Sequence, residues 1–528
     1  MSGLAGIGTI MRLVLRRDRI RIPVWIAALA GLVVASAASV IEIYGTQQEI
    51  DVYAASVGGN PAVVAMTGPP HALDTIGGVV VYETTLVAVV GVALMSIFLV
   101  TRHTRGEEET GRAELLQAAV VGRHARLTAT LFVAAVTNLL LGLIIAVGLA
   151  SLDLPVGGAV AFGLSMTGLG LVFAALAAVS SQVAEYGRAA AAITGAAFGA
   201  AFVIRAAGDV GNGVLSWFSP IGWAQAIRAF GAERWWTLLL LLGFAVFLAV
   251  LAFVLESRRD VGGGLIPPRP GPANAPGDLS GPFGLATRLQ RAGLLGWGAG
   301  VFFLGLAYGS MSNSIEDLVE SNPDLREVLA QQEASLTDSF FATGLLIVAL
   351  VVGGCAIQSM LRLRGEESAG RVESLLATAT SRDRWASSHA AVAFLGATAV
   401  LALGGLGAGL AHSLIVDDWS QLPRLMGAAM ANAPAVWFLG ALALALFGVV
   451  PRAVALAWAV LSLSLVAGML GRTLDLPGWV LNLSPFHHLP SPLIDDLTVA
   501  PLLVLTALAA GLVLLGLASF RRRDLALH

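Results

Sequence analysis

The sequence contains no lysine, and all 31 of its basic residues are arginines. A phosphate-binding loop of the G-x-x-x-x-G-K-[ST] type needs a lysine that reaches the terminal phosphates of a nucleotide. The chain therefore cannot build that loop, and any ATP hydrolysis must take place in a separate polypeptide. Schiff-base chemistry, which needs a lysine amine, is excluded for the same reason.

Charged residues and cysteine are also scarce. Charged residues make up 12% of the 528 residues, hydrophobic residues make up 57%, and the mean hydropathy is +0.81. These values exclude an ordinary soluble domain. The single cysteine, Cys355, cannot form an intrachain disulfide. His487 and His488 lack further ligands at metal-site spacing, so we predict neither a metal site nor a catalytic Ser/His/Asp arrangement.

Long apolar runs take the place of the missing charge. A helix needs roughly 20 mostly apolar residues to cross a bilayer. Twelve such stretches are present, near residues 24–42, 83–101, 127–150, 157–181, 189–204, 236–255, 293–311, 340–361, 386–412, 425–449, 453–470 and 500–519. We therefore predict an all-α polytopic membrane protein with twelve transmembrane helices. We expect Asn138, in the third helix, to bond to a neighbouring helix.

Arginine placement predicts the orientation in the membrane, because basic residues concentrate in cytoplasmic connections. With the N-terminus in the cytoplasm, 25 of the 31 arginines fall on the cytoplasmic side. The six that fall outside are Arg205, Arg228, Arg234, Arg326, Arg424 and Arg472. We therefore expect both termini in the cytoplasm of a bacterial cell membrane.

A linker divides the chain into two halves. Residues 261–282 contain six prolines and six glycines, a composition typical of a flexible connection. We expect one six-helix half at residues 1–260 and another at residues 283–528. Because an even number of spans precedes the linker, both halves begin on the same side of the membrane and form parallel repeats.

A charged segment appears once in each half. Residues 105–118 read RGEEETGRAELLQA and residues 364–377 read RGEESAGRVESLLA, at an offset of 259 residues. Each copy lies between the second and third spans of its half, and we call these two segments, residues 102–126 and 361–385, the connectors. Ser219-Pro220 and Ser484-Pro485 repeat in the same way. The duplication predicts two equivalent contact sites for a paired partner outside the membrane.

Written as a helix, each connector groups its charges. Glu107, Gly111 and Glu114 share one face, and Glu108 stands four residues before Arg112, the spacing of a helical ion pair. The second copy repeats this arrangement with Glu366, Gly370 and Glu373 and with Glu367 paired to Arg371. A glycine between two carboxylates leaves room for another surface to approach. A solvated charged loop is the alternative interpretation of one copy alone.

The connectors resemble the coupling helices of type 2 ABC exporter permeases, which sit in a cleft of the ATPase subunit. In its twelve-helix arrangement the chain resembles the fused actinobacterial permeases for polyketide antibiotics, the tetronasin-type group. The resemblance implies that two ABC ATPase copies bind the connectors. The implied contact residues are Arg105, Gly106, Glu107, Glu108, Gly111, Arg112 and Glu114 in the first copy and Arg364, Gly365, Glu366, Glu367, Gly370, Arg371 and Glu373 in the second.

The resemblance also implies the activity, which is ATP-driven export of hydrophobic drugs or polyketide-like antibiotics, with a role in antibiotic resistance. The chain itself would not be an enzyme, ATP and magnesium would bind in the partner, and no nucleic acid would be involved. A lipid- or glycolipid-exporting ABC permease, an ion-coupled carrier of the major-facilitator kind and a membrane-protein assembly factor are the alternatives. The expected scarcity of ionisable residues inside the spans argues against an ion-coupled carrier.

Related exporters place the cargo between the second and fifth helices of the two halves. Carried over, this implicates residues 83–101, 189–204, 340–361 and 453–470. The candidate wall residues are Phe98, Phe198, Phe202, Phe340, Phe341 and Trp458. Lipid contact or core packing is the alternative role of each, since aromatic side chains fill apolar space.

Overall fold

The computed structural model describes residues 4–58, 61–109, 111, 122–260, 262–266, 274, 277–279, 281–311, 336–470, 477–494 and 498–524. Among these residues it contains helices and no strand. The chain divides into two compact units, Met1–Gly271 and Pro272–His528. This division falls within residues 261–282, the predicted linker.

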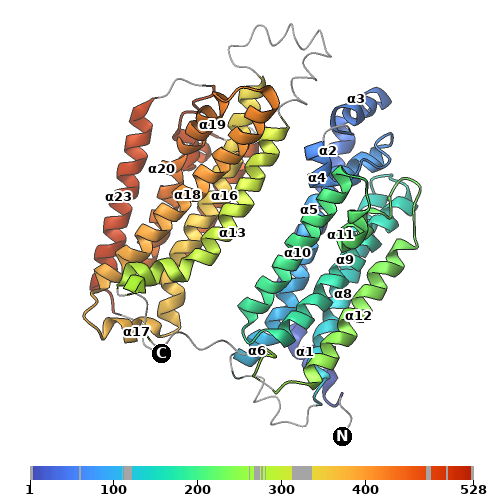
Figure 1. Ribbon diagram of the computed structural model, residues 1–528, viewed down its shortest axis with the longest axis horizontal. Coiled ribbons are helices and arrows are strands. Elements are labelled where there is room, and N and C mark those ends of the chain that lie inside the picture. The colour runs from blue at the N-terminus through green and yellow to red at the C-terminus, as the bar shows by residue number, and fades with distance from the viewer. Residues whose placement is uncertain are drawn as a thin grey trace. The chain divides into compact units, whose positions relative to one another are not determined.

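Unit 1 contains six long helices and several short ones (Figure 1). The long helices are α2 (Arg21–Ile43), α5 (Ile76–His103), α8 (Ala125–Ala150), α9 (Val156–Val183), α10 (Gly187–Val210) and α12 (Thr237–Ser257). The short elements are α1 (Ile7–Arg17), α3 (Gln47–Gly58), α4 (Pro61–Thr67), α6 (Arg105–Glu109), the 3-10 helix η1 (Leu215–Phe218) and α11 (Pro220–Gln225).

Unit 2 repeats this plan from a second set of helices. Its longer helices are α13 (Pro282–Ser310), α16 (Leu336–Ser368), α18 (Arg382–Val416), α19 (Gln421–Met430), α20 (Ala433–Val449), α21 (Leu456–Leu470) and α23 (Val499–Arg522). Its short elements are η2 (Gly277–Leu279), α17 (Arg371–Leu376), η3 (Pro451–Ala453), α22 (Gly478–Leu481) and η4 (Pro485–His488).

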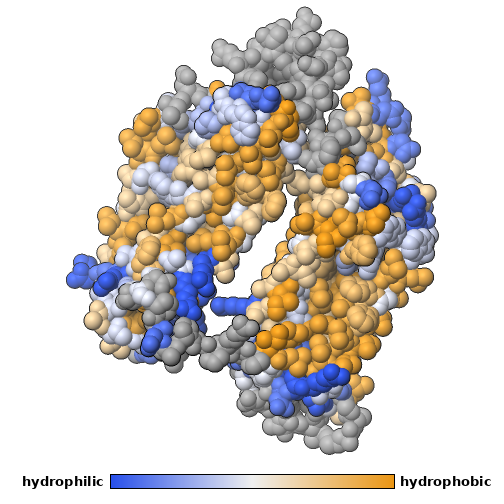
Figure 2. Space-filling view, viewed as in Figure 1, coloured by the Kyte–Doolittle hydropathy of each residue, from blue (hydrophilic) through white to orange (hydrophobic). Residues whose placement is uncertain are grey.

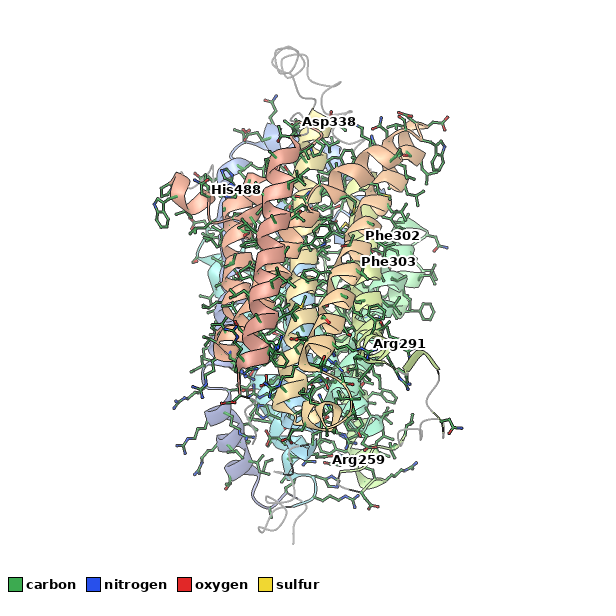
Figure 3. All side chains as sticks on the ribbon, turned by 90° about the vertical axis from the view of Figure 1, so that its left-hand side faces the viewer. Arg259, Arg291, Phe302, Phe303, Asp338 and His488 are labelled. Carbon is green, nitrogen blue, oxygen red and sulfur yellow. The ribbon has the colours of Figure 1, made fainter. Side chains whose placement is uncertain are left out.

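The prediction of twelve membrane spans is confirmed. Twelve helices in the described ranges are long and apolar enough to cross a bilayer, and each coincides with a predicted stretch. On the face shown in Figure 2, hydrophobic residues cover the middle of each unit and hydrophilic residues gather towards its ends. In unit 2, Phe302 and Phe303 lie between Arg291 at one end and Asp338 at the other (Figure 3).

Two features of unit 1 depart from the sequence analysis. Helix α10 continues to Val210, so Arg205 lies inside the helix and not in the loop that follows it. There it is fully buried and bonds to Asp209 at 3.2 Å and to the carbonyl of Ala65 at 2.7 Å. The short helices α3 and α4, between the first two spans, were not predicted.

Helix α9 forms the centre of unit 1, where it contacts α5, α8, α10 and α12. Asn138 on α8 donates to the hydroxyl of Ser96 on α5 at 3.0 Å, and Thr167 on α9 donates to the carbonyl of Asn138 at 3.1 Å. The prediction that Asn138 bonds to another helix is therefore confirmed. Such interhelical hydrogen bonds matter in a membrane, where apolar burial does not drive helix association.

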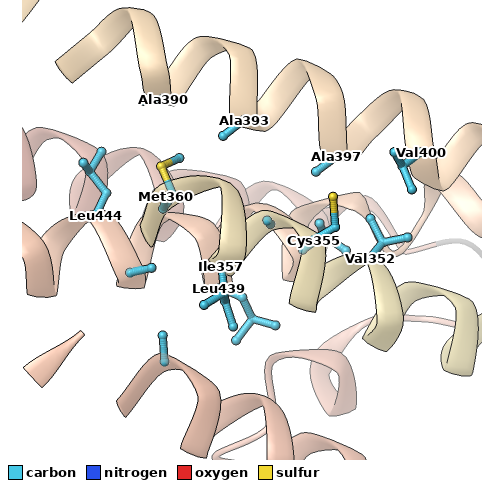
Figure 4. Close-up of a cluster of buried hydrophobic side chains, with 14 of the residues drawn as sticks. Val352, Cys355, Ile357, Met360, Ala390, Ala393, Ala397, Val400, Leu439 and Leu444 are labelled. Atoms are coloured by element: carbon cyan, nitrogen blue, oxygen red, sulfur yellow. The ribbon is translucent and has the colours of Figure 1, made fainter. Parts of the chain in front are cut away.

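Small residues bring the helices of unit 2 close together. Figure 4 shows Cys355 and Met360 on α16 facing Ala393 and Ala397 on α18. Cys355 is buried as a free thiol. Where α13 crosses α18, a Cβ added to Gly305 would stand 2.1 Å from a backbone carbonyl oxygen. Backbones approach this closely only where glycine or another small residue lies in the contact.

The Gly305 crossing yields a stability prediction. We expect Gly305→Val to destabilise the chain by about 1–3 kcal/mol, because the new side chain meets backbone and cannot be relieved by a rotamer change. Thermal unfolding of the purified chain in detergent measures the loss.

Gly300→Val on the same helix is the matched control, because nothing lies within 4 Å of its Cβ position. It should change stability by no more than about 0.5 kcal/mol. Equal midpoints for the two variants would show that the α13–α18 contact is not as close as described.

Candidate functional site

Each connector begins at the end of the second long helix of its unit. In unit 1 it continues from α5 into α6, and in unit 2 it comprises the last turns of α16 followed by α17. Arg112 and Glu114 lie outside the described residues. Gly106 and Gly365 lie in the last turns before each break, where both are half-buried.

A left-handed glycine interrupts both connectors. Gly111 has a φ of 68° and Gly370 has a φ of 69°, a conformation that costs little only for glycine. In unit 2 this residue separates α16, which ends at Ser368, from α17, which begins at Arg371. The prediction of one continuous helical face through Glu366, Gly370 and Glu373 is therefore wrong. The glycine turns the chain and does not act as a gap between two carboxylates.

The second glutamate of the unit 1 connector is buried among arginines. The side chain of Glu108 is 2% exposed. Its carboxylate accepts hydrogen bonds from Arg259, at 2.7 and 3.0 Å, from Arg105 at 2.6 Å, and from Arg126. Arg259 follows the end of α12, so Glu108 joins the connector to the last helix of its unit.

The matching glutamate of unit 2 has the same kind of partner. Glu367 accepts hydrogen bonds at 2.9 and 2.8 Å from Arg523, which follows the end of α23. Arg523 also lies over the rings of Phe447 and Phe520. The predicted i,i+4 pair between Glu367 and Arg371 is wrong, since the carboxylate of Glu367 binds the arginine that follows the last helix.

A second arginine at the start of the third long helix completes this arrangement. In unit 1, Arg123 donates to three backbone carbonyls at the end of α12, each at 3.0 Å. In unit 2, Arg382 donates to two carbonyls at the end of α23, at 3.3 and 2.6 Å. A guanidinium at a helix C-terminus satisfies orphan carbonyls and the helix dipole. We call these groups the latches: Glu108, Arg123 and Arg259 in unit 1 and Glu367, Arg382 and Arg523 in unit 2.

The first glutamate of each connector is also engaged within its own unit. Glu107 forms an ion pair with Arg17 at the end of α1. Glu366 accepts a hydrogen bond from Arg371 at 2.6 Å and lies 3.0 Å from the guanidinium of Arg362. These acidic side chains face inward, so they are not free to meet a partner.

The exposed residues of the unit 2 connector lie on one side of α17 and in the segments next to it. Val372 is buried, and Leu375 and Leu376 pack against the core. Glu373 and Ser374 are exposed and line an open groove that continues to Thr380. Of the predicted contact residues, Gly370, Arg371 and Glu373 lie on this exposed side, and Arg364 and Gly365 are half-buried.

The predicted cargo residues have different surroundings. Phe98 is 49% exposed and lines a cavity of about 630 Å³ between α2, α5 and α10. Arg21, Arg102 and Arg188 stand at its charged end, and Trp25 and Met95 contribute to its apolar wall. The structure thus places Phe98, among the predicted cargo residues, at the wall of a cavity.

The other candidates pack against neighbouring groups. Phe198 meets Phe173 edge to face, and Phe202 lies beneath the guanidinium of Arg205. Phe341 is 1% exposed and belongs to the core of unit 2, where Phe340 and His412 contact it. Trp458 is 37% exposed and packs beside α16 near Gly354.

No described group of three or more His, Cys, Asp or Glu side chains is arranged to hold a metal ion. His488 bonds to the carbonyl of Asn482 at 2.8 Å. The latch arginines are the functional candidates that the sequence reasoning missed. A signal for them exists, since the chain reads RRD at residues 258–260 and again at residues 522–524.

The latches predict an unequal response of the two units to loss of the carboxylate charge. Glu108→Gln leaves three arginines without their shared counter-ion and should cost about 3–5 kcal/mol, the usual effect of breaking a buried pair. Glu367→Gln leaves only Arg523, which is 18% exposed, and should cost about 1–3 kcal/mol. Thermal unfolding of each purified variant measures the difference.

A double-mutant cycle isolates the unit 2 pair. Glu367→Gln and Arg523→Gln should together cost less than the sum of the two single changes, with a coupling of about 0.5–3 kcal/mol. Glu373→Gln, on the exposed face of the same connector, is the control and should be close to neutral. Additive losses for Glu367 and Arg523 would show that the latch carries no interaction energy.

Known proteins are similar to this chain in sequence. The family model described as "Multidrug efflux system permease Rv1217c, C-terminal domain" matches residues 279–521. The chain is 40% identical over 527 residues to the multidrug efflux system permease protein Rv1217c of Mycobacterium tuberculosis, covering 99% of this chain and 96% of that protein. Together with the twelve apolar helices, this likeness makes the chain a multi-pass protein of the cell membrane, and it belongs to the family of Rv1217c-type multidrug efflux system permeases.

Proposed function

We propose that the chain is the membrane-spanning subunit of an ATP-driven ABC exporter of type 2. Two copies of a separate ABC ATPase would dock on the connectors from the cytoplasm, and ATP and magnesium would bind in those subunits. The cargo would be hydrophobic drugs or polyketide-like antibiotics. The observation that carries this proposal is the duplicated connector, which in each unit is bound by a latch to the end of the last helix.

The latches supply a mechanical reason for the duplication. A connector joined only to its flanking helices could bend without moving the rest of the unit. Glu108 and Glu367 instead tie the connectors to α12 and α23, and Arg123 and Arg382 hold the final carbonyls of the same helices. A displacement of the connector therefore moves the last long helix of a unit together with the second and third. This is the property that an external motor requires.

The cargo class is supported by the cavity beside Phe98 and by the relative. The wall of the cavity is apolar along α2 and α5, which suits a hydrophobic molecule drawn from the membrane. The relative from Mycobacterium tuberculosis is named as a multidrug efflux permease. Export, and not import, follows from that likeness.

An ion-coupled carrier is the second candidate, and the described ionisable groups do not favour it. Such carriers depend on titratable side chains within the membrane. The buried pair Arg205 and Asp209 lies in the last two turns of α10, near the end of a span. Its members bind each other, and Arg205 also binds the final carbonyls of α4. This arrangement closes a helix end and does not form a chain of proton carriers.

The docking proposal makes a prediction at α17. Ser374→Trp places a large ring in the exposed groove and should reduce co-purification of the proposed partner ATPase by about tenfold or more, since a steric clash at an interface centre removes more than about 1.4 kcal/mol. Export of a fluorescent hydrophobic drug from cells should fall in parallel. Both quantities are measured against the unmodified pair.

Ser374→Ala at the same position is the matched control and should retain both association and export. The unfolding midpoint of the isolated permease should be the same for all three proteins, because the side chain is exposed. Normal ATPase association by the Trp variant would exclude α17 as the docking surface. Drug export by the permease in cells that lack the ATPase would exclude ATP hydrolysis by that subunit as the energy source.

A further inference from the structure

Two small cavities meet at the end of unit 1 that lies opposite the connector. One has a volume of about 40 Å³ and lies between α5, α9 and α11, and the other has a volume of about 160 Å³ and lies between α10, η1 and α11. They share four lining residues, Pro69, His71, Gln225 and Arg228. Neither cavity belongs to the connector or to the cavity beside Phe98.

The loops around the cavities hold an unusual backbone. Ala72, Arg228 and Phe230 have φ values of 54°, 55° and 63°, a region that side-chain-bearing residues rarely occupy. The ring of Phe230 is 8% exposed and lies where a side chain on Gly77 or Gly158 would be. The buried ring fixes the turn, and the turn directs Arg228 towards the cavities. Strain of this kind persists where the surroundings impose it, and it is concentrated at binding sites.

Two residues that line both cavities, Gln225 and Arg228, have polar atoms without partners. Nε of Arg228 and Oε1 of Gln225 are buried and have no hydrogen-bond partner in the described structure. The Nε2 atom of Gln225 donates a hydrogen bond to the carbonyl of Thr67 at 2.8 Å, which fixes the orientation of the Gln225 amide. A buried polar group of this kind normally bonds to something, so the cavity calls for a polar occupant.

The charges around the cavities determine whether the occupant is an anion or a cation. Neither Arg228 nor Arg234 forms an ion pair with any described residue. The carboxylate among the lining residues, Asp209, is already bound to Arg205 and Ser216. Burial, and then the nearby charges of Arg228 and Arg234, lower the pKa of His71 to about 4. At neutral pH the site therefore has two unbalanced positive charges and a neutral imidazole.

We propose that this end of unit 1 binds a carboxylate group, with Arg228 as its principal ligand. The planar fork of a guanidinium matches the two oxygens of a carboxylate, and Arg234 and His71 complete the surroundings. The carboxylate comes either from a small free anion or from the end of a larger exported molecule, which enters by the more open cavity.

The described residues of unit 2 do not carry the same site. When the repeated Ser-Pro pairs are aligned, Gln225 corresponds to Pro490 and Arg228 corresponds to Leu493, which is 8% exposed. The proline and leucine have no group that could bind a carboxylate. At these aligned positions the two halves of the duplicated chain therefore differ, and the proposed carboxylate site belongs to unit 1.

The experiment uses the purified full chain in detergent at pH 7.5, without any ATPase, so its outcome does not depend on the energy source. Sodium acetate should raise the unfolding midpoint by about 3 °C when it saturates the site, and neutral acetamide should not. Arg228→Gly should abolish this shift. Because glycine accepts a φ of 55° without strain, the midpoint of this variant without acetate should equal or exceed that of the original chain.

Three further arms complete the test. Arg291→Gln, at an exposed arginine of α13, should keep the full acetate shift. Hexanoate separates the two sources of the carboxylate. If it shifts the unfolding midpoint more than acetate does, the ligand is the end of an extended molecule. If it shifts the midpoint less, the ligand is a small free anion. An acetate shift that survives in Arg228→Gly, or an equal shift with sodium chloride in the original chain, would overturn the proposal.

Discussion

The ion pair between a connector glutamate and the arginine that follows the last helix is the interaction on which the rest of the structure depends. Within a membrane, lipid tails are as apolar as the helix surfaces, so apolar burial alone does not decide which helices are neighbours. Close contacts at glycines and a few polar bonds between helices determine which helices pack together. The ion pairs of Glu108 with Arg259 and of Glu367 with Arg523 hold the last long helix of each unit next to the end of the second long helix. They thereby determine which helices are neighbours in the bundle. A buried pair adds little net stability but makes the wrong arrangement costly, because each charge would then lack its partner.

The two units use the same latch in different surroundings. In unit 1, Glu108 is shared by three arginines, and the amphipathic helix α1 supplies Arg17 for Glu107. In unit 2 the corresponding acids are Glu367 and Glu366. The first meets Arg523 alone, and the second is neutralised by arginines of its own connector. The duplicated sequence thus preserves the link to the last helix and varies the number of charges around it. The cavities lined by Arg228 show the same divergence at the other end of unit 1.

The sequence predicted the spans well because each needs only a long apolar run, a property of neighbouring residues. It predicted that the connectors are special, because a repeated motif is visible without a structure. It did not predict what their charges do. The partners of Glu108 and Glu367 stand 151 and 156 residues further along the chain, far beyond the three or four residues that helical periodicity can relate. The break at Gly370 was also missed, since glycine is common within these spans and only its φ of 69° distinguishes this one. Phe98 and Phe341 look alike in sequence, yet only folding places one beside a cavity and the other in the core.

Internal use of the acidic residues changes what a partner can recognise. A carboxylate that already accepts two or more charge-assisted hydrogen bonds gains little from another cation, and losing its first partners would leave buried arginines uncompensated. Under the proposed function, recognition of the unit 2 connector would therefore depend on α17, where Glu373 and Ser374 are exposed and Leu375 and Leu376 pack against the core. In the proposed exporter, the acidic pair would transmit force and the following turn would receive it. Two adjacent parts of one motif would thus have separate tasks in that exporter, and the left-handed Gly370 between them sets the angle between α16 and α17.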